Sequence, residues 1–208
     1  MRKLVLKMSM SIDGFVGGPN GEADWLFRSI DDASAAWEVE RLWDASLHIM
    51  GSRTFQDMRV WWPSSNEPYA PPMNEIPKAY FSRGRSSDAS TTRALEDARR
   101  LFPRSADKAS SHLESWETAA KLTGDLATEI AALKAEDGKP ILAHGGAAFA
   151  RSLIATGLID EYHLLVHPVA LGRGLSIFAD LSEPIDLALT ASQRFPAGAI
   201  ANTYRPRS

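Results

Sequence analysis

The sequence predicts an α/β protein with a mainly parallel central sheet and a C-terminal antiparallel hairpin. Short apolar runs typical of strands alternate with amphipathic runs typical of helices along most of the chain. Several of the strand-like runs end at glycine or at polar residues, and a helical pattern follows at once. This alternation favours parallel strands joined by crossover helices. The 208 residues suit one domain, spanning 1–208, with a sizeable core.

The composition excludes several classes of function. The net charge is −3 at pH 7 and cysteine is absent. A slightly acidic chain is not expected to bind nucleic acid, and a chain without cysteine has no disulfides, thiolate zinc sites or thiol nucleophiles. We therefore expect no metal. No segment approaches the roughly 20 apolar residues that span a bilayer, and the N-terminus lacks the apolar region of a signal peptide. We expect a cytoplasmic protein that does not bind membranes.

Residues 3–12 alternate between apolar and polar side chains, which predicts the first strand. Lys7, Ser9 and Ser11 lie on one face of this strand together with Val5. The glycine-rich stretch "DGFVGGPNGEADW" then indicates a loop.

A helix follows, with Asp31 or Asp32 as its N-terminal cap and an apolar stripe from Ala35 to Trp43. The second strand, "SLHIM", ends at Gly51, where "SRTFQDM" begins another helix.

The middle of the chain is less regular. Proline is frequent from Trp61 to Pro77, which excludes a continuing helix or a central strand there. "KAYFS" is the third strand. Residues 84–115 are polar and predict an insertion with little core of its own, in which Thr92–Phe102 could form a helix. A further helix contains Leu122, Leu126, Ile130 and Leu133, and Gly138 closes it.

The last third of the chain predicts two more strands around a helix, and then a hairpin. "KPILAH" is the fourth strand, "AAFARSLIATG" the helix and "EYHLLVHPVAL" the fifth strand. The tail from Ile185 to Pro206 folds back around Pro196, Ala197 and Gly198.

Three of the predicted strand ends carry groups that suit a phosphate. Ligands of open α/β sheets bind beyond the carboxyl ends of the strands, and the free N–H groups of a helix's first turn attract anions. The end of the second predicted strand offers hydroxyl groups and a guanidinium beside the backbone amides, and the end of the third offers a serine and an arginine. The end of the fourth offers bare glycine backbone. Three such points suit a dinucleotide that carries a pyrophosphate and one further phosphate. The residues are Gly51, Ser52, Arg53 and Thr54; Ser82 and Arg83; and His144, Gly145 and Gly146.

A Gly-Gly pair between a strand and a helix also suits a simple tight turn. The pair here is not part of a G-x-G-x-x-G pattern, so a Rossmann domain is not indicated.

A set of motifs in fixed order resembles the dihydrofolate-reductase-like superfamily, and within it the reductase domain of riboflavin-biosynthesis deaminase-reductases. The motifs are "SIDGFVGGPNGEADW", "IMGSRTF", "WWP", "MNEIPKAYFSR", "LAHGGAAFARSLIATGLIDEYHLLVHPVALGRG" and "IF" at 177–178. The resemblance covers nearly all of the chain except about residues 84–115. It implies a three-layer α/β/α fold, NADPH as the hydride donor, and a homodimer.

The resemblance also implies roles for individual residues. Val16 and Gly17 would lie against the nicotinamide, and Ser82 and Arg83 would meet the 2′-phosphate of the adenosine. Gly51, Arg53 and Thr54 would hold the phosphates. The pyrophosphate would meet the backbone of Gly145, Gly146, Ala147 and Ala148.

Two departures from the family pattern matter. The first glycine of the Gly-Gly pair of dihydrofolate reductases aligns best with His144, which puts the cis peptide of those enzymes in question here. Their buried acid falls near Ala35, which argues against dihydrofolate as the substrate. The deaminase half of the riboflavin enzymes is missing, so we expect a stand-alone reductase.

Hydride transfer needs a proton at some stage, and Asp13, Asp24 and Asp32 are candidate donors. Asp13 also suits a turn carboxylate that binds its own backbone, and Asp32 also suits a helix cap. Trp25 is our first choice to stack on a flat heteroaromatic substrate. His167 could lie near the pocket, and Arg173 could contact an anionic substrate.

The sequence thus predicts an NADPH-dependent reductase of a small pterin-like or pyrimidine-like heterocycle. Two alternatives remain open. One is a catalytically silent ligand-binding or regulatory protein on the same scaffold, which the alanine at position 35 favours. The other is an enzyme of this fold that uses a flavin-type cofactor.

Overall fold

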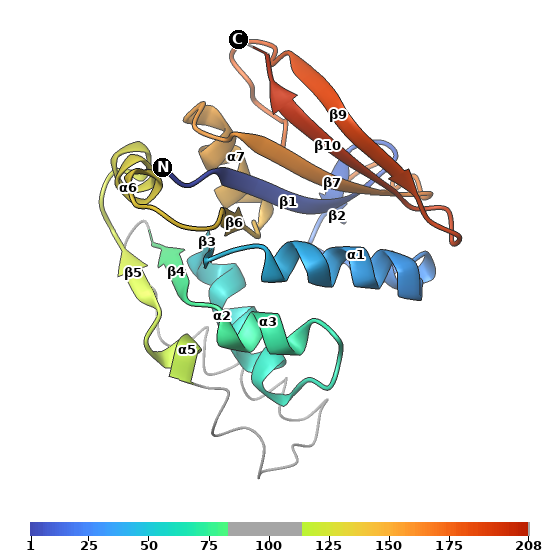
Figure 1. Ribbon diagram of the computed structural model, residues 1–208. Coiled ribbons are helices and arrows are strands. Elements are labelled where there is room, and N and C mark those ends of the chain that lie inside the picture. Colours follow the sequence, from blue (N-terminus) through green and yellow to red (C-terminus); the bar gives the residue numbers. More distant parts are fainter. Residues whose placement is uncertain (83–113, 208) are drawn as a thin grey trace.

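The structure, a computed structural model of the chain, describes residues 1–82 and 114–207 (Figure 1). In these residues an eight-stranded sheet has the strand order β5-β4-β3-β6-β1-β7-β10-β9. The strands from β5 to β7 in this order run parallel, and β10 and β9 form the antiparallel edge. The strands are β1 (Leu4–Ser11), β3 (Leu47–Gly51), β4 (Lys78–Phe81), β5 (Ala120–Leu122), β6 (Ile141–Ala143), β7 (Glu161–His167), β9 (Leu187–Arg194) and β10 (Ile200–Pro206). The predicted mainly parallel sheet with a closing hairpin is confirmed.

Helices cover both faces of the sheet, which completes the predicted three-layer α/β/α arrangement (Figure 1). One face packs on α6 (Leu126–Ala135) and α7 (Ala147–Ala155) through Ile130, Leu153 and Ile154. The other face packs on the remaining helices, whose buried side chains are Leu42, Phe55, Met73 and Trp116. These helices are α1 (Asp32–Trp43), α2 (Ser52–Trp61), α3 (Ala70–Glu75) and α5 (Glu114–Glu117).

Strand β1 lies in the middle of the sheet, and its alternation decides which groups face which layer. Leu4, Leu6 and Met10 belong to the core under α6 and α7, while Val5 belongs to the core on the opposite face. The alternating side chains of a strand point to opposite faces. Lys7, two residues after Val5, therefore projects toward the layer of α1.

The predicted helix caps are confirmed at the start of α1. Asp31, not Asp32, is the capping residue, and its carboxylate accepts from the Ser34 amide over 2.8 Å. The second carboxylate oxygen of Asp31 accepts from the Ala197 amide over 2.7 Å. One side chain thus caps α1 and ties it to the turn of the C-terminal hairpin.

Two local predictions were wrong, and one short helix was not predicted. As expected, α2 does not continue into the proline-rich stretch and no strand forms there, but this stretch contains the separate helix α3, because its prolines lie in the first turn, where the missing N–H costs nothing. Leu122 ends strand β5 instead of beginning a helix, and α6 starts after its own cap, Asp125. Gly138 lies beyond the end of α6 at Ala135, in a turn with φ of 143°.

Smaller elements complete the described chain. They are the strands β2 (Phe15–Gly17) and β8 (Leu175–Ser176), which pair with each other, and the 3-10 helices η1 (Asp24–Arg28) and η2 (Trp62–Ser64). The predicted insertion, with its possible helix at Thr92–Phe102, lies almost entirely outside the described residues. In the described part of the chain, no helix combines the length and apolar character needed to cross a bilayer.

Candidate functional site

Two helices begin at the carboxyl edge of the sheet without a capping side chain. The N-terminal caps of α2 and α7 are Gly51 and Gly146, and among the described residues no side chain caps either helix. Neither helix has an acidic residue in its first turn. By contrast, α1 and α6 are capped by Asp31 and Asp125. The first-turn amides of α2 and α7 therefore keep their capacity to bind an anion.

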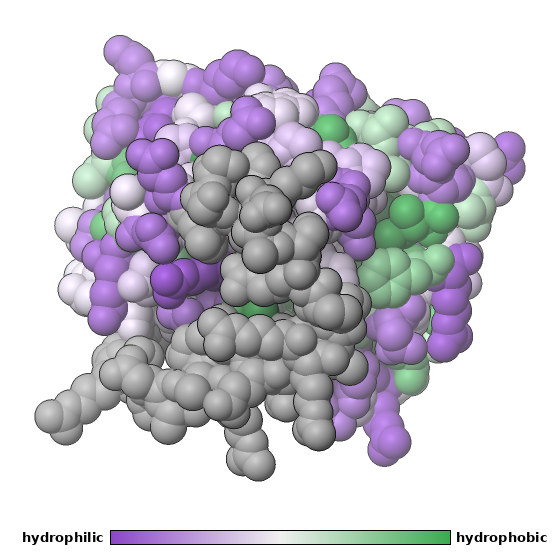
Figure 2. All heavy atoms as spheres, turned by 90° about the horizontal axis from the view of Figure 1, so that it is seen from below, coloured by the Kyte–Doolittle hydropathy of each residue, from purple (hydrophilic) through white to green (hydrophobic). Residues whose placement is uncertain are grey.

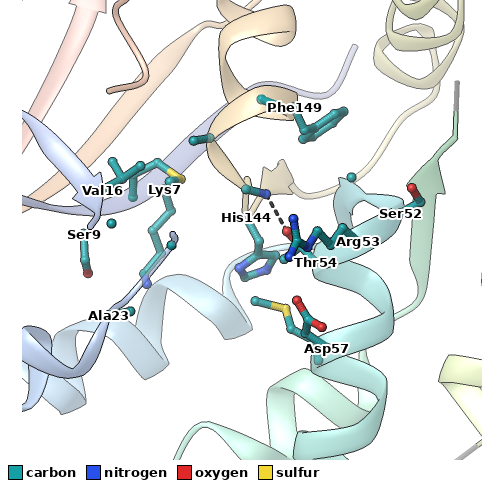
Figure 3. A pocket seen from close by; sticks show the side chains of 18 of the residues that line it. Lys7, Ser9, Val16, Ala23, Ser52, Arg53, Thr54, Asp57, His144 and Phe149 are labelled. Carbon is teal, nitrogen blue, oxygen red and sulfur yellow. Dashed lines mark hydrogen bonds between the residues drawn. The ribbon is translucent and has the colours of Figure 1, made fainter. Parts of the chain in front are cut away.

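The same two helix starts are in direct contact. The Gly51 amide donates to the Gly145 carbonyl over 3.1 Å. The Gly146 amide donates to the Thr54 hydroxyl over 2.6 Å (Figure 3). The strand ends before α2 and α7, two of the three at which the sequence predicts phosphate contacts, thus form one continuous surface.

Close packing explains why glycine occupies these turns. A Cβ at Gly145 would lie 2.8 Å from the Met8 sulfur, and a Cβ at Gly51 would lie 3.0 Å from Cβ of Phe149. Gly145 also has φ of +84°, which favours glycine. At these two glycine turns, side chains from β1 and α7 occupy the space that a Cβ would need. The turns also lie at the edge of the pocket.

The third predicted strand end lies beside the first two. Phe81, the last residue of β4, stacks on Phe149 of α7 with ring centroids 5.2 Å apart. Ser82 follows directly and its amide donates to the Leu122 carbonyl over 3.1 Å. Arg83 lies outside the described residues.

A pocket of about 1210 Å³ joins these strand ends to the middle of the sheet (Figure 3). All residues predicted to bind the cofactor lie in its lining, except Gly145, which is buried behind it, and Arg83. The predicted residues in the lining are Val16, Gly17, Gly51, Ser52, Arg53, Thr54, Ser82, His144, Gly146, Ala147 and Ala148. Drug-sized ligands occupy pockets of about 300–1,000 Å³, so this space suits a larger ligand or two adjacent ones.

The other end of the pocket contains a charged pair that the sequence analysis did not identify as a site. Lys7 of β1 and Glu38 of α1 both line the pocket, and Lys7 Nζ lies 3.3 Å from the Glu38 carboxylate. Their side chains are only 13% and 10% exposed. Ser9 donates to the same carboxylate over 3.4 Å. Burial raises the pKa of the Tyr69 hydroxyl, and the nearby charge of Glu38 adds to that increase.

This pair also bears on the buried acid of dihydrofolate reductases, which falls near Ala35 in this chain. Ala35 lies in α1, as does Glu38, about one turn further along the helix. Glu38 therefore supplies a carboxylate to the pocket from the same helix. The alternation of β1 and the helical stripe of α1 place Lys7 and Glu38 on core-facing positions, but they do not indicate that the two charges meet.

A second carboxyl lies on the opposite wall. Asp57 of α2 lines the pocket one turn after Arg53 (Figure 3). The Asp57 side chain remains exposed to solvent. Partial desolvation by the surrounding protein nevertheless raises the pKa of its carboxyl, and the charge of Arg53 opposes this increase.

The predicted catalytic residues Asp13, Asp32 and Trp25 lie outside the pocket as the described residues define it. Asp13 accepts from the amides of Leu171 and Gly172, with a shortest distance of 2.7 Å, and so ties two loops together. Asp32 is exposed at the start of α1. Trp25 is 3% exposed, and its indole nitrogen donates to the Glu22 carbonyl over 3.0 Å.

Two further candidates also lie away from the pocket lining. His167 is fully buried, shares a 2.8 Å hydrogen bond with the Ser29 hydroxyl and meets the edge of the Trp25 ring. Asp24 lies 4.0 Å from Arg28 on η1.

A histidine pair connects the pocket lining to the core: His144 lines the pocket, and His48 is fully buried. The rings of His48 and His144 meet edge to face with centroids 4.6 Å apart. Burial lowers the pKa of His48 to about 3 and that of His144 well below its ordinary value. Among the described residues, His144 Nε2 has no hydrogen-bond partner, and neither has the indole nitrogen of Trp62, another lining residue. The peptide bond between Gly145 and Gly146 is cis, so the question raised by the alignment of His144 is answered in favour of the cis form.

Comparison with known proteins agrees with this geometry. The family described as "RibD C-terminal domain" matches residues 2–201. A protein of Bacillus subtilis strain 168, "Uncharacterized protein YyaP", is 25% identical over 98% of this chain and 94% of its own length.

Three solved structures are similar to the whole described fold. A pyrimidine reductase-like protein of Corynebacterium diphtheriae has a TM-score of 0.61 at 17% identity, covering 100% of this chain and 92% of its own. A deaminase and 5-amino-6-(5-phosphoribosylamino)uracil reductase of Thermotoga maritima has a TM-score of 0.62 at 16% identity, covering 99% of this chain and 57% of its own. Dihydrofolate reductase of Enterococcus faecalis, complexed with NADP(H), has a TM-score of 0.58 at 11% identity, covering 99% and 97%. These likenesses show the dihydrofolate-reductase-like fold.

Proposed function

The chain belongs to the RibD C-terminal domain family, and from that premise we propose that it is a stand-alone NADPH-dependent reductase of a small pyrimidine-like or pterin-like heterocycle. One observation carries the proposal. A single pocket joins two uncapped helix N-termini, which suit phosphates, to the buried pair of Lys7 and Glu38, which suits a polar heterocycle.

The residues at the first end of the pocket fit NADPH. The first-turn amides of α2 and α7, the hydroxyl of Ser52 and the guanidinium of Arg53 are donors for phosphate oxygens. Val16 and Gly17 also line the pocket and offer the nicotinamide an apolar surface. When bound, NADPH would supply the hydride.

The residues at the second end fit one edge of a heterocycle. The ammonium of Lys7 donates hydrogen bonds and the carboxylate of Glu38 accepts them. Pyrimidines and pterins present a carbonyl oxygen beside N–H groups, so the pair matches such an edge. Because both side chains are nearly buried and already paired with each other, the ligand edge would meet the remaining donors of the Lys7 ammonium and the remaining acceptor sites of the Glu38 carboxylate.

The reduction also consumes a proton. Asp57 is suited to carry it, because its raised pKa keeps a proton on the carboxyl at a higher pH than an ordinary aspartate would allow. This assignment replaces Asp13 and Asp32, which lie outside the pocket lining.

The experiment is a steady-state assay of NADPH consumption with a panel of oxidised pyrimidines and pterins. The proposal expects saturable consumption with at least one class, and slower consumption with NADH. A chain that binds these heterocycles but oxidises no cofactor would instead support the catalytically silent alternative. Glu38 weakens that alternative, because it supplies the carboxylate that Ala35 cannot.

We also propose a homodimer. Its support is the exposed antiparallel edge of the sheet, where Leu189 of β9 is 56% exposed and Ile200 of β10 is 37% exposed. Light scattering in solution tests this proposal. A cytoplasmic location stays a prediction of the sequence.

A further inference from the structure

The pocket has an apolar wall that reaches the neighbourhood of Glu38. Large apolar side chains from η1, from the turn after it and from the end of α2 line the pocket: Leu26, Phe27, Ile30, Met58, Trp61 and Trp62. The Trp62 ring lies 6.1 Å from that of Tyr69, whose hydroxyl interacts with Glu38. Figure 2 shows apolar side chains gathered on the underside of the molecule, toward the end at which α1 begins.

Phe27 is the most exposed member of this wall. It is 71% exposed, whereas Trp25, two residues earlier in the same 3-10 helix, is 3% exposed. A phenylalanine that lines a pocket while exposed to water gains free energy when an apolar group covers it. The wall is therefore complementary to an apolar part of a ligand.

The charges near this wall do not suit a phosphate. Glu38 and Glu67 both line the pocket, and the ammonium of Lys7 is already 3.3 Å from Glu38. Among the cations in the described lining, Arg53 lies at the start of α2 beside the glycine turn, and Arg151 of α7 lies 3.8 Å from Asp180. A phosphate dianion next to the apolar wall would lose hydration and meet two carboxylates, and none of the described lining residues there offers it an unpaired cation.

We propose that the heterocyclic substrate of this chain carries a neutral aromatic substituent where a phosphorylated sugar would otherwise stand. The proposal rests on the proposed function, because it assigns the heterocycle to Lys7 and Glu38. The substituent then packs against Phe27 and other apolar residues of the wall. The chain would thus differ from the Thermotoga maritima enzyme, whose name specifies a phosphoribosylamino group.

The test is isothermal titration calorimetry of the full chain with three ligands that share one ring. They are 5,6-diaminouracil, its 6-benzylamino analogue and its 6-phosphoribosylamino analogue. We expect the benzyl compound to bind about tenfold more tightly than the bare ring, since a buried phenyl group contributes 1.4 kcal/mol or more. The phosphoribosyl compound should bind no more tightly than the bare ring.

Two variants test whether the apolar wall causes the tighter binding of the benzyl compound and whether the acidic side chains disfavour the phosphoribosyl compound. Phe27→Ala should remove most of the benzyl advantage and leave the affinity for the bare ring unchanged. Glu67→Lys should raise the affinity for the phosphoribosyl compound. Leu181→Ala, at an exposed apolar residue outside the pocket lining, is the matched control and should change no affinity.

The outcomes distinguish failure of this inference from failure of the proposed heterocycle site. Binding of the bare ring with no gain from benzyl, or with a tenfold gain from phosphoribosyl, overturns this inference alone. Equal losses for all three ligands in Phe27→Ala overturn it as well. Binding of none of the three overturns both the inference and the proposed heterocycle site.

Discussion

The amide nitrogen of Gly146 lies 2.6 Å from the hydroxyl oxygen of Thr54, which joins the glycine turn before α7 to the first turn of α2. This hydrogen bond holds two uncapped helix N-termini side by side at one end of the pocket. Together with the backbone hydrogen bond from Gly51 to Gly145, the Thr54 side chain therefore sets the spacing of the proposed phosphate donors.

Replacing Thr54 by valine removes the acceptor and keeps the shape. The buried amide of Gly146 then lacks its partner, so we expect a loss of about 1–3 kcal/mol in the free energy of unfolding. NADPH affinity should fall about tenfold, because the two helix starts are no longer fixed. Urea unfolding and cofactor titration measure the two effects. Thr54→Ser keeps the hydroxyl and should behave as the wild type; equal losses in both variants would contradict the role of the bond.

Gly145 and Gly157 offer a matched pair for the close packing of the glycine turn. Both have positive φ, at +84° and +68°, but only at Gly145 would a Cβ meet a neighbour, the Met8 sulfur at 2.8 Å. Gly145→Ala should therefore destabilise the fold by about 1–3 kcal/mol more than Gly157→Ala. Thermal unfolding compares them. Equal destabilisation would show that the packing against β1 does not require a bare backbone.

Lys7→Met and Glu38→Gln test the proposed recognition of the heterocycle. Each change removes one partner of the buried pair, so kcat/KM for the substrate should fall at least about a hundredfold. NADPH affinity should stay within about twofold of the wild type, because the phosphate end of the pocket is untouched. Steady-state kinetics and cofactor titration separate the two. Loss of cofactor binding in both variants would place the pair at the cofactor instead.

Asp57 predicts a pH dependence of the reaction. Its folded-state pKa is raised by partial desolvation, and the protonated form is the one that donates. The rate should therefore fall as the pH rises through this raised pKa. Asp57→Asn should lower kcat and flatten the profile over that range, while Asp44→Asn, an exposed aspartate at the end of α1, should leave it unchanged. An unaltered profile in Asp57→Asn would exclude the carboxyl as donor.

His48 predicts a loss of stability in acid. Burial lowers its folded pKa from 6.5 to about 3, so below pH 6.5 the unfolded chain binds a proton that the folded chain excludes. Stability contributed by the neutral ring is complete above pH 6.5 and declines as the pH falls toward about 3. At one pH unit below 6.5 the loss is about 1.4 kcal/mol for this histidine. In His48→Asn, the free energy of unfolding should therefore change by about 1.4 kcal/mol less than in the wild type between neutral pH and one pH unit below 6.5. An unchanged difference would contradict the burial of a neutral ring.

Much of the fold and of the phosphate end could be predicted from the sequence. The alternation of Leu4, Leu6 and Met10 in β1 and the abrupt switches from strand to helix at Gly51 and at Gly146 are local signals. Local signals are sufficient where a parallel sheet brings all strand ends to one edge. The helix α3 and the strand β5 were missed because a first-turn proline and a three-residue strand leave little pattern in the sequence.

The substrate end could not be predicted in the same way. Lys7 and Glu38 are 31 positions apart, and only the packing of α1 on β1 brings them within 3.3 Å. Asp13 and Trp25 are residue types that often occur in active sites. In the structure, however, backbone amides satisfy the Asp13 carboxylate, and a backbone carbonyl satisfies the Trp25 indole. A long-range contact decides which of several acidic residues faces a pocket, and a single sequence contains no direct record of that contact.

The measurement that tests the central claim most directly is an equilibrium titration of the full chain with NADPH, followed by tryptophan fluorescence. Trp61 and Trp62 line the pocket, so a bound nicotinamide nucleotide should quench their emission. We predict saturable quenching that NADP⁺ reverses by competition and that Arg53→Gln weakens. Fluorescence that does not saturate at any NADPH concentration up to the millimolar range would contradict the account.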